Sequence, residues 1–393
     1  MKHGAQHPVE SGLDVAIRRR RKRFRNVRIG LVVHQASVDC SLRHAVTCFE
    51  SVGARLRAIF APEHGVAGTE QDLRPVSREQ RDGFPVHSLY GEHLEPTPSM
   101  LDGIDLMVFD LQDVGSRYYT FISTMFHTYR ACADAGIEFM VLDRPNPIGG
   151  LGVEGNVVEP THLSYVGIHH LPARHGMTVG ELAMMLREER SIRGRLEVVA
   201  MREWRRRLWY DQLCLPWVMP SPNMPTLDTA TVYPGMCLIE GTNLSEGRGT
   251  TRPFEIFGAP WLDQQRMGRL LREARLPGIV FREVQFKPTF NKYAGQVCRG
   301  FQIHVSDRER FKPYLTGIAI LRATLALHRA HFAWRPPPYE FETQKLPIDI
   351  LLGSTRVRQM IEAESSLREM QASWQRELAA FKRRRNEFLL YDV

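Results

Sequence analysis

Residues 106–120 have the sequence LMVFDLQDVGSRYYT, in which a short apolar run passes directly into a loop that carries Asp110 and Asp113. Residues 56–65, LRAIFAPEHG, repeat this arrangement with Glu63 in the loop. Short apolar runs that end in polar turns are typical of buried strands. The pattern therefore predicts that both loops follow the carboxyl ends of strands.

Two more apolar runs, 29–33 and 139–142, also end in polar clusters, and stretches with helical spacing at 42–52 and 118–135 lie between the runs. Alternating strands and helices indicate parallel strands joined by crossover helices. We therefore predict an α/β fold with a Rossmann-like, mostly parallel sheet and helices on both of its faces. The polar clusters should then meet at the edge where such sheets bind ligands.

The length of 393 residues exceeds what one hydrophobic core usually supports, which favours two domains. Prolines crowd residues 216–234, as expected of an extended crossing, and we place the boundary near Tyr233. The predicted domains are a catalytic domain at 27–233 and a smaller α+β domain at 234–393 that completes a cleft. In the second domain we expect a strand at 236–240, helices at 263–275 and 312–330, β-structure at 279–305 and a closing helix at 366–388.

Much of the net charge of +8 lies in residues 18–25, RRRRKRFR. We expect residues 1–26 to form an unordered basic tail, with attraction to nucleic acid as the alternative. No stretch reaches the ~18 apolar residues of a membrane span, and the first 30 residues lack the apolar core of a signal peptide. These features favour a cytoplasmic protein without a membrane span, unless the native start differs. The oligomeric state stays open.

The catalytic chemistry is expected from side chains, because no phosphate-binding glycine loop follows the first strand and the six cysteines form no CxxC pair. We predict neither a cofactor nor a metal. Glu63, held at a strand exit, is suited to protonate a leaving oxygen. Glycosidases pair such an acid with a second carboxylate roughly 5–10 Å away, for which Asp110 and Asp113 are candidates, and Tyr119 offers a phenol. The alternative for Glu63 is a structural ion pair with an arginine such as Arg117.

The substrate-binding candidates are polar residues in the same loops and in two later ones, the proline-stiffened 220–225 and the glycine-rich 240–251. A tight turn held by a contact between Glu246 and Arg248 is the structural alternative for the second loop, and His34 is equally compatible with a structural role. The candidates are His34, His64, Asp110, Arg117, Arg144, Asn146, His175, Asn223, Glu246 and Arg248.

Six strings occur in order along the chain: PEHG, FDLQDVGSRYYT, LDRPNPIGG, RHGMTVGELA, PSPNMPT and EGTNLSEGRGTTRPFE. Together they resemble the bacterial exo-β-N-acetylmuramidases, NamZ-like peptidoglycan hydrolases formerly known as a domain of unknown function. The resemblance extends from about residue 29 to residue 391.

The resemblance implies a Rossmann-like domain, a smaller C-terminal domain and a cleft between them that releases terminal N-acetylmuramic acid from the non-reducing end of peptidoglycan fragments. It places the catalytic glutamate at Glu63 and the conserved tyrosine-bearing segment at residues 117–121. Our own hypothesis is that Asp113 or Tyr119 assists Glu63. The lactyl carboxylate of the sugar needs a cation, for which Arg117, Arg144 and Arg248 are candidates by charge. The chain departs from the family at HQASVD (34–39), where an Asn-rich turn is usual, and at Phe121, which has no hydroxyl.

Three other classes are separable by experiment. A muropeptide- or sugar-binding protein without turnover would bind and form no product. A nucleotide-dependent transferase is disfavoured by the absent phosphate loop. A nucleic-acid-associated protein would be retained on DNA with steep salt dependence.

Overall fold

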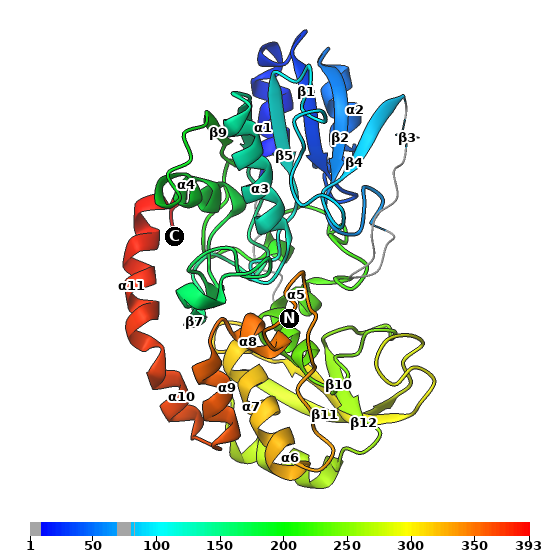
Figure 1. The fold of residues 1–393 in the computed structure, drawn as a ribbon, viewed down its shortest axis with the longest axis vertical. Coiled ribbons are helices and arrows are strands. Elements are labelled where there is room, and N and C mark those ends of the chain that lie inside the picture. The colour runs from blue at the N-terminus through cyan, green and yellow to red at the C-terminus, as the bar shows by residue number, and fades with distance from the viewer. Residues whose placement is uncertain (1–8, 69–79, 82) are drawn as a thin grey trace.

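The computed structural model describes residues 9–68, 80–81 and 83–393, which form two lobes stacked along the long axis of the molecule (Figure 1). The first lobe contains a seven-stranded sheet of order β3-β4-β2-β1-β5-β6-β9. Its strands are β1 (Arg28–Val33), β2 (Arg55–Ala61), β3 (Gln80–Arg81), β4 (Phe84–Ser88), β5 (Leu106–Asp110), β6 (Glu138–Leu142) and β9 (Leu196–Val199). Neighbouring strands are parallel except for the edge pair β3 and β4. The predicted α/β fold is confirmed.

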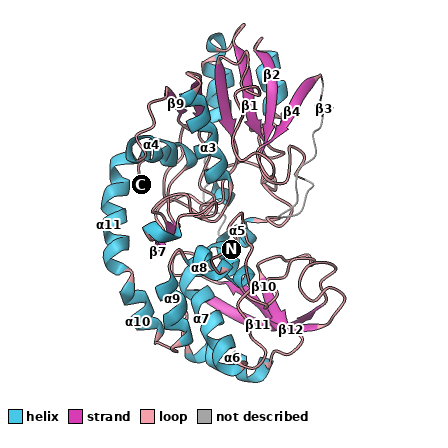
Figure 2. Cartoon of the chain, in the orientation of Figure 1, coloured by secondary structure: helices cyan, strands magenta, loops and turns pink. Residues whose placement is uncertain are grey.

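Helices cover both faces of this sheet (Figure 2). Along β1, Ile29, Leu31 and Val33 belong to the core cluster shared with α1 (Gly12–Arg19) and α2 (Ala45–Ser51). Val32 belongs instead to the cluster that contains α3 (Phe121–Asp134) and α4 (Val179–Glu189). A strand buried on both faces is apolar at every position, which is why residues 29–33 form a continuous apolar run.

The expectation of an unordered basic tail is wrong for its described part. Helix α1 begins with a capping box formed by Ser11 and Asp14, and its residues Leu13, Ala16 and Ile17 are buried against the sheet. The arginines from residue 18 onward extend from the exposed end of this helix and from the 3-10 turn η1 (Arg21–Arg23). The arginine-rich run thus begins at the solvent-exposed end of helix α1, after the apolar residues of that helix.

The second lobe is the smaller α+β domain that we expected. It contains a three-stranded antiparallel sheet of order β10-β12-β11, next to helices α6 and α7 (Figure 2). The strands are β10 (Ile256–Ala259), β11 (Ile279–Phe286) and β12 (Cys298–Val305). The helices are α5 (Leu227–Met236), α6 (Gln264–Glu273), α7 (Pro313–Leu327), α8 (Pro347–Leu352), α9 (Thr355–Glu362), α10 (Leu367–Ser373) and α11 (Gln375–Arg385). Between the lobes lies the two-stranded pair β7 (Glu154–Val157) and β8 (Pro172–Arg174).

Two local predictions in this lobe are wrong. Residues 236–240, expected as a strand, form the end of α5 and the 3-10 helix η4 (Cys237–Gly241), because an apolar run this short does not distinguish a buried strand from a buried helix. The closing helix is divided into α10 and α11 at Trp374, whose side chain is almost fully buried. The boundary expected near Tyr233 falls within α5.

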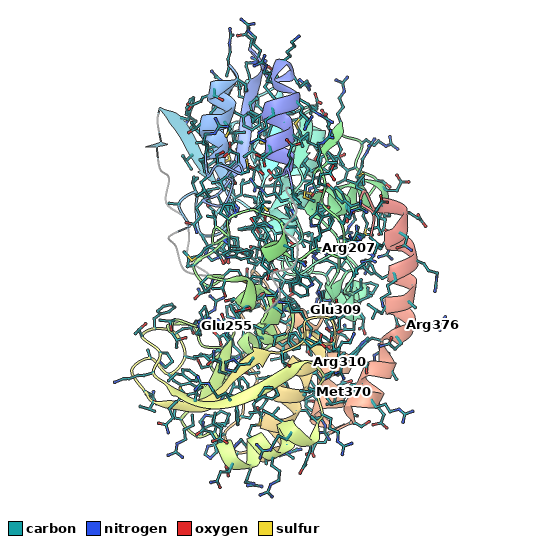
Figure 3. The ribbon with its side chains drawn as sticks, turned by 180° about the vertical axis from the view of Figure 1, so that it is seen from behind. Arg207, Glu255, Glu309, Arg310, Met370 and Arg376 are labelled. Carbon is teal, nitrogen blue, oxygen red and sulfur yellow. The ribbon has the colours of Figure 1, made fainter. Side chains whose placement is uncertain are left out.

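The end of the chain returns to the first lobe. Helix α11 runs along the side of the molecule from the second lobe to the first (Figure 1). Beyond it, the Tyr391 hydroxyl donates a 2.6 Å hydrogen bond to Asp143, which follows β6. Seen from behind, side chains fill the space between the lobes around the labelled Arg207 and Glu309 (Figure 3). Arg308, which follows β12, forms a 2.7 Å ion pair with Asp211. In the described part of the chain, no helix has the length and apolar character needed to cross a bilayer.

Candidate active site

A pocket lies where the two lobes meet, and both contribute to its wall. The first lobe provides Glu63, His64, Tyr118, Tyr119, Thr120 and Val166; the crossing segment and α5 provide Ser221, Asn223, Met224 and Tyr233; the second lobe provides Glu240, Arg248, Phe254, Tyr339 and Glu340. The carboxyl edge of the parallel sheet therefore opens onto this pocket, as the sequence predicts for β2 and β5.

Glu63 is placed by the turn that follows β2. The Gly65 amide donates to the Pro62 carbonyl at 3.1 Å, and His64 and Gly65 both adopt positive φ, +74° and +80°. This turn directs the Glu63 carboxylate toward the start of α3, where the Thr120 hydroxyl donates a 2.8 Å hydrogen bond to its Oε2. Glu63 retains only 6% of its exposure, so it lies inside the pocket rather than on the outer surface.

Backbone carbonyls, and not the suggested ion pair with Glu63, hold the guanidinium of Arg117. Its guanidinium donates to the backbone carbonyls of Asn156 at 3.0 Å, Leu171 at 2.9 Å and Leu351, in a buried position that joins the two lobes. Arg117 therefore has a structural position. It is not among the residues that line the pocket.

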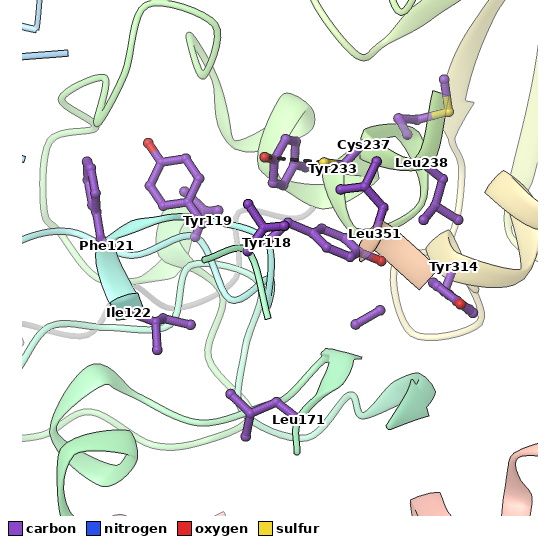
Figure 4. Close-up of a cluster of buried hydrophobic side chains, with 14 of the residues drawn as sticks. Tyr118, Tyr119, Phe121, Ile122, Leu171, Tyr233, Cys237, Leu238, Tyr314 and Leu351 are labelled. Carbon is purple, nitrogen blue, oxygen red and sulfur yellow. Dashed lines mark hydrogen bonds between the residues drawn. The ribbon is translucent and has the colours of Figure 1, made fainter. Parts of the chain in front are cut away.

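Tyr119 lies on the pocket wall opposite Tyr233, with ring centroids 6.0 Å apart and ring planes at 90°. Figure 4 shows Tyr118, Tyr119 and Tyr233 meeting from the two sides, with Tyr233 also close to Cys237. Burial raises the pKa of the Tyr119 phenol well above 10; Ser221 opposes the rise, and the charges of Asp113 and Glu63 add to it. A phenol in this setting stays protonated and serves as a hydrogen-bond donor.

Asp113 lies behind Tyr119 and is not a lining residue. Its Oδ2 accepts a 2.7 Å hydrogen bond from the Gly115 amide and lies 3.7 Å from His175 Nε2. Burial raises the pKa of Asp113 to about 7, and burial lowers the pKa of His175 to about 3, so His175 is neutral across the physiological range. The structure thus brings Glu63 and Tyr119 together and places Asp113 and His175 one layer deeper.

Four charged side chains of the second lobe form a chain along one side of the pocket. Arg248 donates from Nε at 3.0 Å and from Nη2 at 2.6 Å to Glu240 Oε1, and its Nε lies 3.6 Å from Glu246. Lys292 donates to Glu246 at 2.8 Å. The Tyr339 hydroxyl donates to the other oxygen of Glu240 at 2.6 Å. Burial acts to raise the pKa of Glu240, but the charge of Arg248 and the hydrogen bonds from Tyr339 and Arg248 together outweigh it and lower that pKa.

The glycine-rich loop at residues 240–251 has both the structural contact and the position at the pocket that its sequence suggests. The contact between Glu246 and Arg248 exists, as the structural alternative requires, and Arg248 also lines the pocket. Asn223 and His64 line the pocket as well, from the positions that the sequence assigned to binding.

Five further predicted binding residues occupy buried hydrogen-bond networks away from the pocket wall. Asp110 and Arg144 form a bidentate ion pair, with distances of 2.6 and 2.8 Å. His34 contacts the Pro220 carbonyl through Nδ1 and accepts from the Gln112 amide through Nε2. Asn146 donates to the Met177 carbonyl at 3.0 Å, and His175 accepts from the Met177 amide at 3.1 Å. Polar groups at this sheet edge are enclosed by neighbouring loops, so they need partners within the protein.

Three lining residues, Glu340, Tyr339 and Tyr233, were not among the site residues predicted from the sequence. Glu340 and Tyr339 follow the proline run 336–338, whose combination of aromatic residues and acids was the available signal. Tyr233 was assigned to a domain boundary. None of the His, Cys, Asp and Glu residues in the described ranges form a group of three or more that could hold a metal ion.

Comparison with known proteins agrees with this architecture over both lobes. Residues 29–228 match the family model described as exo-β-N-acetylmuramidase NamZ, N-terminal, and residues 231–391 match its C-terminal counterpart. The peptidoglycan β-N-acetylmuramidase NamZ of Bacillus subtilis (strain 168) is 42% identical over 386 residues, which cover 98% of this chain and 91% of that protein.

Two crystal structures of DUF1343 family proteins from Bacteroides fragilis NCTC 9343 are similar to this one. They have TM-scores of 0.88 and 0.77 and sequence identities of 32% and 28%, and each comparison covers 98% of this chain and 99% of the other. With both of its halves matched and the whole chain aligned, this protein belongs to the NamZ family of exo-β-N-acetylmuramidases.

Proposed function

We propose that this protein is a glycoside hydrolase that releases terminal N-acetylmuramic acid from the non-reducing end of peptidoglycan fragments. The observation that carries the proposal is the position of Glu63, a buried carboxylate within a pocket lined by both lobes, in a chain 42% identical to a peptidoglycan β-N-acetylmuramidase. A pocket lined from two sides suits the end of a saccharide chain better than its middle.

Glu63 is the proposed general acid. It protonates the glycosidic oxygen as the bond to the anomeric carbon breaks. The hydrogen bond from Thr120 to Oε2 fixes the rotation of the carboxyl group, and the turn at His64 and Gly65 fixes its direction. Both restraints reduce the reorganisation required before proton transfer.

Glu340 is the proposed second carboxylate. It lines the same pocket from the opposite lobe and accepts a 3.1 Å hydrogen bond from the Tyr90 hydroxyl. The charges of Glu63 and Glu340 both raise the pKa of Tyr90 and of Tyr165, after burial as the main cause, so the two carboxylates flank the same phenols. Glu340 is placed to activate water or to stabilise positive charge at the anomeric carbon.

Tyr119 and Asp113 have assisting roles in this proposal. Tyr119 contributes a hydrogen-bond donor at the pocket wall, and Asp113 acts through Tyr119 by the effect of its charge on that phenol. Replacement of Glu340 by Gln should therefore reduce kcat far more than replacement of Asp113 by Asn. Equal losses would contradict this assignment.

Arg248 is the proposed partner of the lactyl carboxylate that distinguishes N-acetylmuramic acid from N-acetylglucosamine. Of the three arginines considered from the sequence, Arg117 and Arg144 are engaged elsewhere, and Arg248 lines the pocket. Glu240 holds its guanidinium in place through two N–H groups. A guanidinium fixed in this way can bind a carboxylate with little loss of side-chain entropy.

The test compares 4-nitrophenyl N-acetylmuraminide with the matching N-acetylglucosaminide, and both with the disaccharide MurNAc–GlcNAc. We expect cleavage of the muraminide and the disaccharide only. The Glu63→Gln variant should lose about 10²- to 10⁴-fold in kcat on the disaccharide, and less on the nitrophenyl substrate, because nitrophenolate leaves without a proton. Its melting temperature should be nearly unchanged.

The matched control is Glu92→Gln, since the Glu92 side chain is 82% exposed and does not line the pocket. It should behave as the wild type. A fully active Glu63→Gln variant would contradict the assignment of the acid. Tight sugar binding by the wild type without any product would identify the non-catalytic sugar-binding protein instead.

A further inference from the structure

A second pocket adjoins the first, and Glu340 lines both. The second pocket is lined by Leu94, His127, Ser164, Tyr165, Ile168, Glu340, Phe341 and Glu342. If the terminal sugar occupies the first pocket, the bond to be cleaved lies beside Glu340. The next sugar then lies in the second pocket.

The wall between the two pockets is a tight turn at residues 339–342. The Tyr339 amide donates to the Glu342 carbonyl and the Glu342 amide to the Tyr339 carbonyl, both at 2.9 Å. The two central residues, Glu340 and Phe341, have φ of +45° and +66°, a left-handed conformation that is strained for side chains other than glycine. Strain of this kind persists where the surrounding structure holds it, most often at binding and catalytic sites. Here it places Glu340 and Phe341 on the lining of one continuous site.

Phe341 presents an aromatic surface to this second pocket. It is 49% exposed, which is unusual for a phenylalanine. Its ring meets Tyr90 at 5.3 Å and 71°, and Tyr165 at 5.2 Å and 77°, both edge-to-face contacts. On the far side of Tyr165, the His127 ring stacks at 6.1 Å and 16°. This packing fixes Phe341 while part of its surface stays open.

Polar groups that can form hydrogen bonds with sugar hydroxyls lie around the aromatic rings. Glu342 Oε1 is held by the amides of Gln344 at 2.8 Å and Lys345 at 3.3 Å, which keeps this carboxylate fixed as an acceptor. Within the described residues, the buried Ser164 hydroxyl has no hydrogen-bond partner. An apolar ring beside a few fixed polar groups is the usual composition of a saccharide site, because one side of a pyranose presents C–H groups and its edge presents hydroxyls.

We infer that this second pocket is the binding subsite for the N-acetylhexosamine ring on the leaving-group side of the scissile bond, with Phe341 as its stacking surface. The inference rests on the proposed function, because it needs a saccharide whose terminal residue enters the first pocket. It assigns Phe341 to recognition of the leaving sugar and not to the chemistry, which belongs to Glu63 and Glu340.

The experiment compares two substrates that differ only beyond the scissile oxygen, MurNAc–GlcNAc and methyl β-N-acetylmuraminide. Both have alcohol leaving groups that need a proton, so they differ mainly in occupancy of the second pocket. We expect Phe341→Ala to raise KM for the disaccharide about tenfold with kcat nearly unchanged, which corresponds to about 1.4 kcal/mol of binding. Its kcat/KM for the methyl glycoside should equal that of the wild type.

Phe341→Trp keeps an aromatic surface in the same left-handed position and should restore the disaccharide KM. The control is Val280→Ala, since Val280 on β11 is also an exposed apolar residue, at 57%; this change should leave the KM of both substrates as in the wild type. An equal loss on both substrates in Phe341→Ala, or no loss on either, would overturn the subsite. A wild-type protein that cleaves neither substrate would overturn the proposed function itself, and the subsite with it.

Discussion

Replacing Arg144 by Met should destabilise the protein strongly and leave its affinity for sugar unchanged. Arg144 and Asp110 form two hydrogen bonds of 2.6 and 2.8 Å, and Arg144 also donates to the Val38 carbonyl at 3.1 Å. Asp110 is fully buried and Arg144 retains 5% of its exposure. Burial lowers the pKa of Arg144, but the charge of Asp110 and its hydrogen bond together outweigh this effect and raise that pKa, so the guanidinium stays protonated.

The expected loss of stability comes from Asp110, which the Arg144→Met change leaves buried without its partner. Removing one partner of a buried ion pair costs about 3–5 kcal/mol, which for a domain of this size corresponds to a melting temperature lower by roughly 6–20 °C. The double variant Asp110→Leu with Arg144→Met removes both charges and should recover most of the loss, because no uncompensated charge stays buried.

The assay is urea unfolding followed by circular dichroism, with KM for the nitrophenyl muraminide measured at a temperature where each variant is folded. The urea midpoint of Arg144→Met should fall with an unchanged m value, and KM should stay within about twofold of the wild type. An unchanged midpoint together with a KM raised tenfold would refute this reasoning. It would show that Arg144 contacts the substrate, as the sequence alone suggests.

Three further predictions concern other sites. Burial lowers the pKa of His175 to about 3, so the stabilising contribution of the neutral imidazole is complete above pH 6.5. This contribution is lost as the pH falls toward 3, at up to about 1.4 kcal/mol per pH unit. In the His175→Asn variant, the urea midpoint should therefore change less with pH over this range. Arg248→Met should weaken inhibition by free N-acetylmuramic acid roughly 10- to 150-fold, the equivalent of about 1.5–3 kcal/mol, without changing inhibition by N-acetylglucosamine. Gly115→Ala should lower the melting temperature more than Gly136→Ala, because φ is positive at both glycines but only at Gly115 would the new Cβ approach another side chain, Asn146, to 2.3 Å.

The strands of the parallel sheet and the capping of α4 were predictable because their determinants are local. Each buried strand is apolar along its length and ends in a polar turn, and Thr178 and Glu181 form the capping box that their three-residue spacing predicts. Glu63 was found for the same reason, since it directly follows a strand whose position is clear. Local sequence thus defines which residues reach the edge of the sheet.

What the sequence does not define is which polar residues at this edge pair with one another. Asp110 is the last residue of β5 and Arg144 follows the adjacent strand β6, and either could have faced a ligand. Only their mutual geometry shows that they neutralise each other. Glu340 was missed because its position in the pocket depends on contacts with Tyr90, 250 residues earlier, which no local pattern contains.

The pocket depends on how firmly the two lobes are held together, and the buried contacts between them argue for a fixed arrangement. Arg117, in the loop before α3, donates to the carbonyl of Leu351 in α8 as well as to carbonyls of the first lobe. Arg385, at the end of α11, donates to the carbonyls of Gly150 and Gly176 at 3.2 and 3.1 Å. Separation of the lobes would break the hydrogen bond from Arg117 to Leu351 and those from Arg385 to Gly150 and Gly176, each worth about 1.5–3 kcal/mol because the donor is charged. Glu63 and Glu340 therefore face a common space before any substrate arrives, and the free energy of sugar binding is not needed to bring the two carboxylates together.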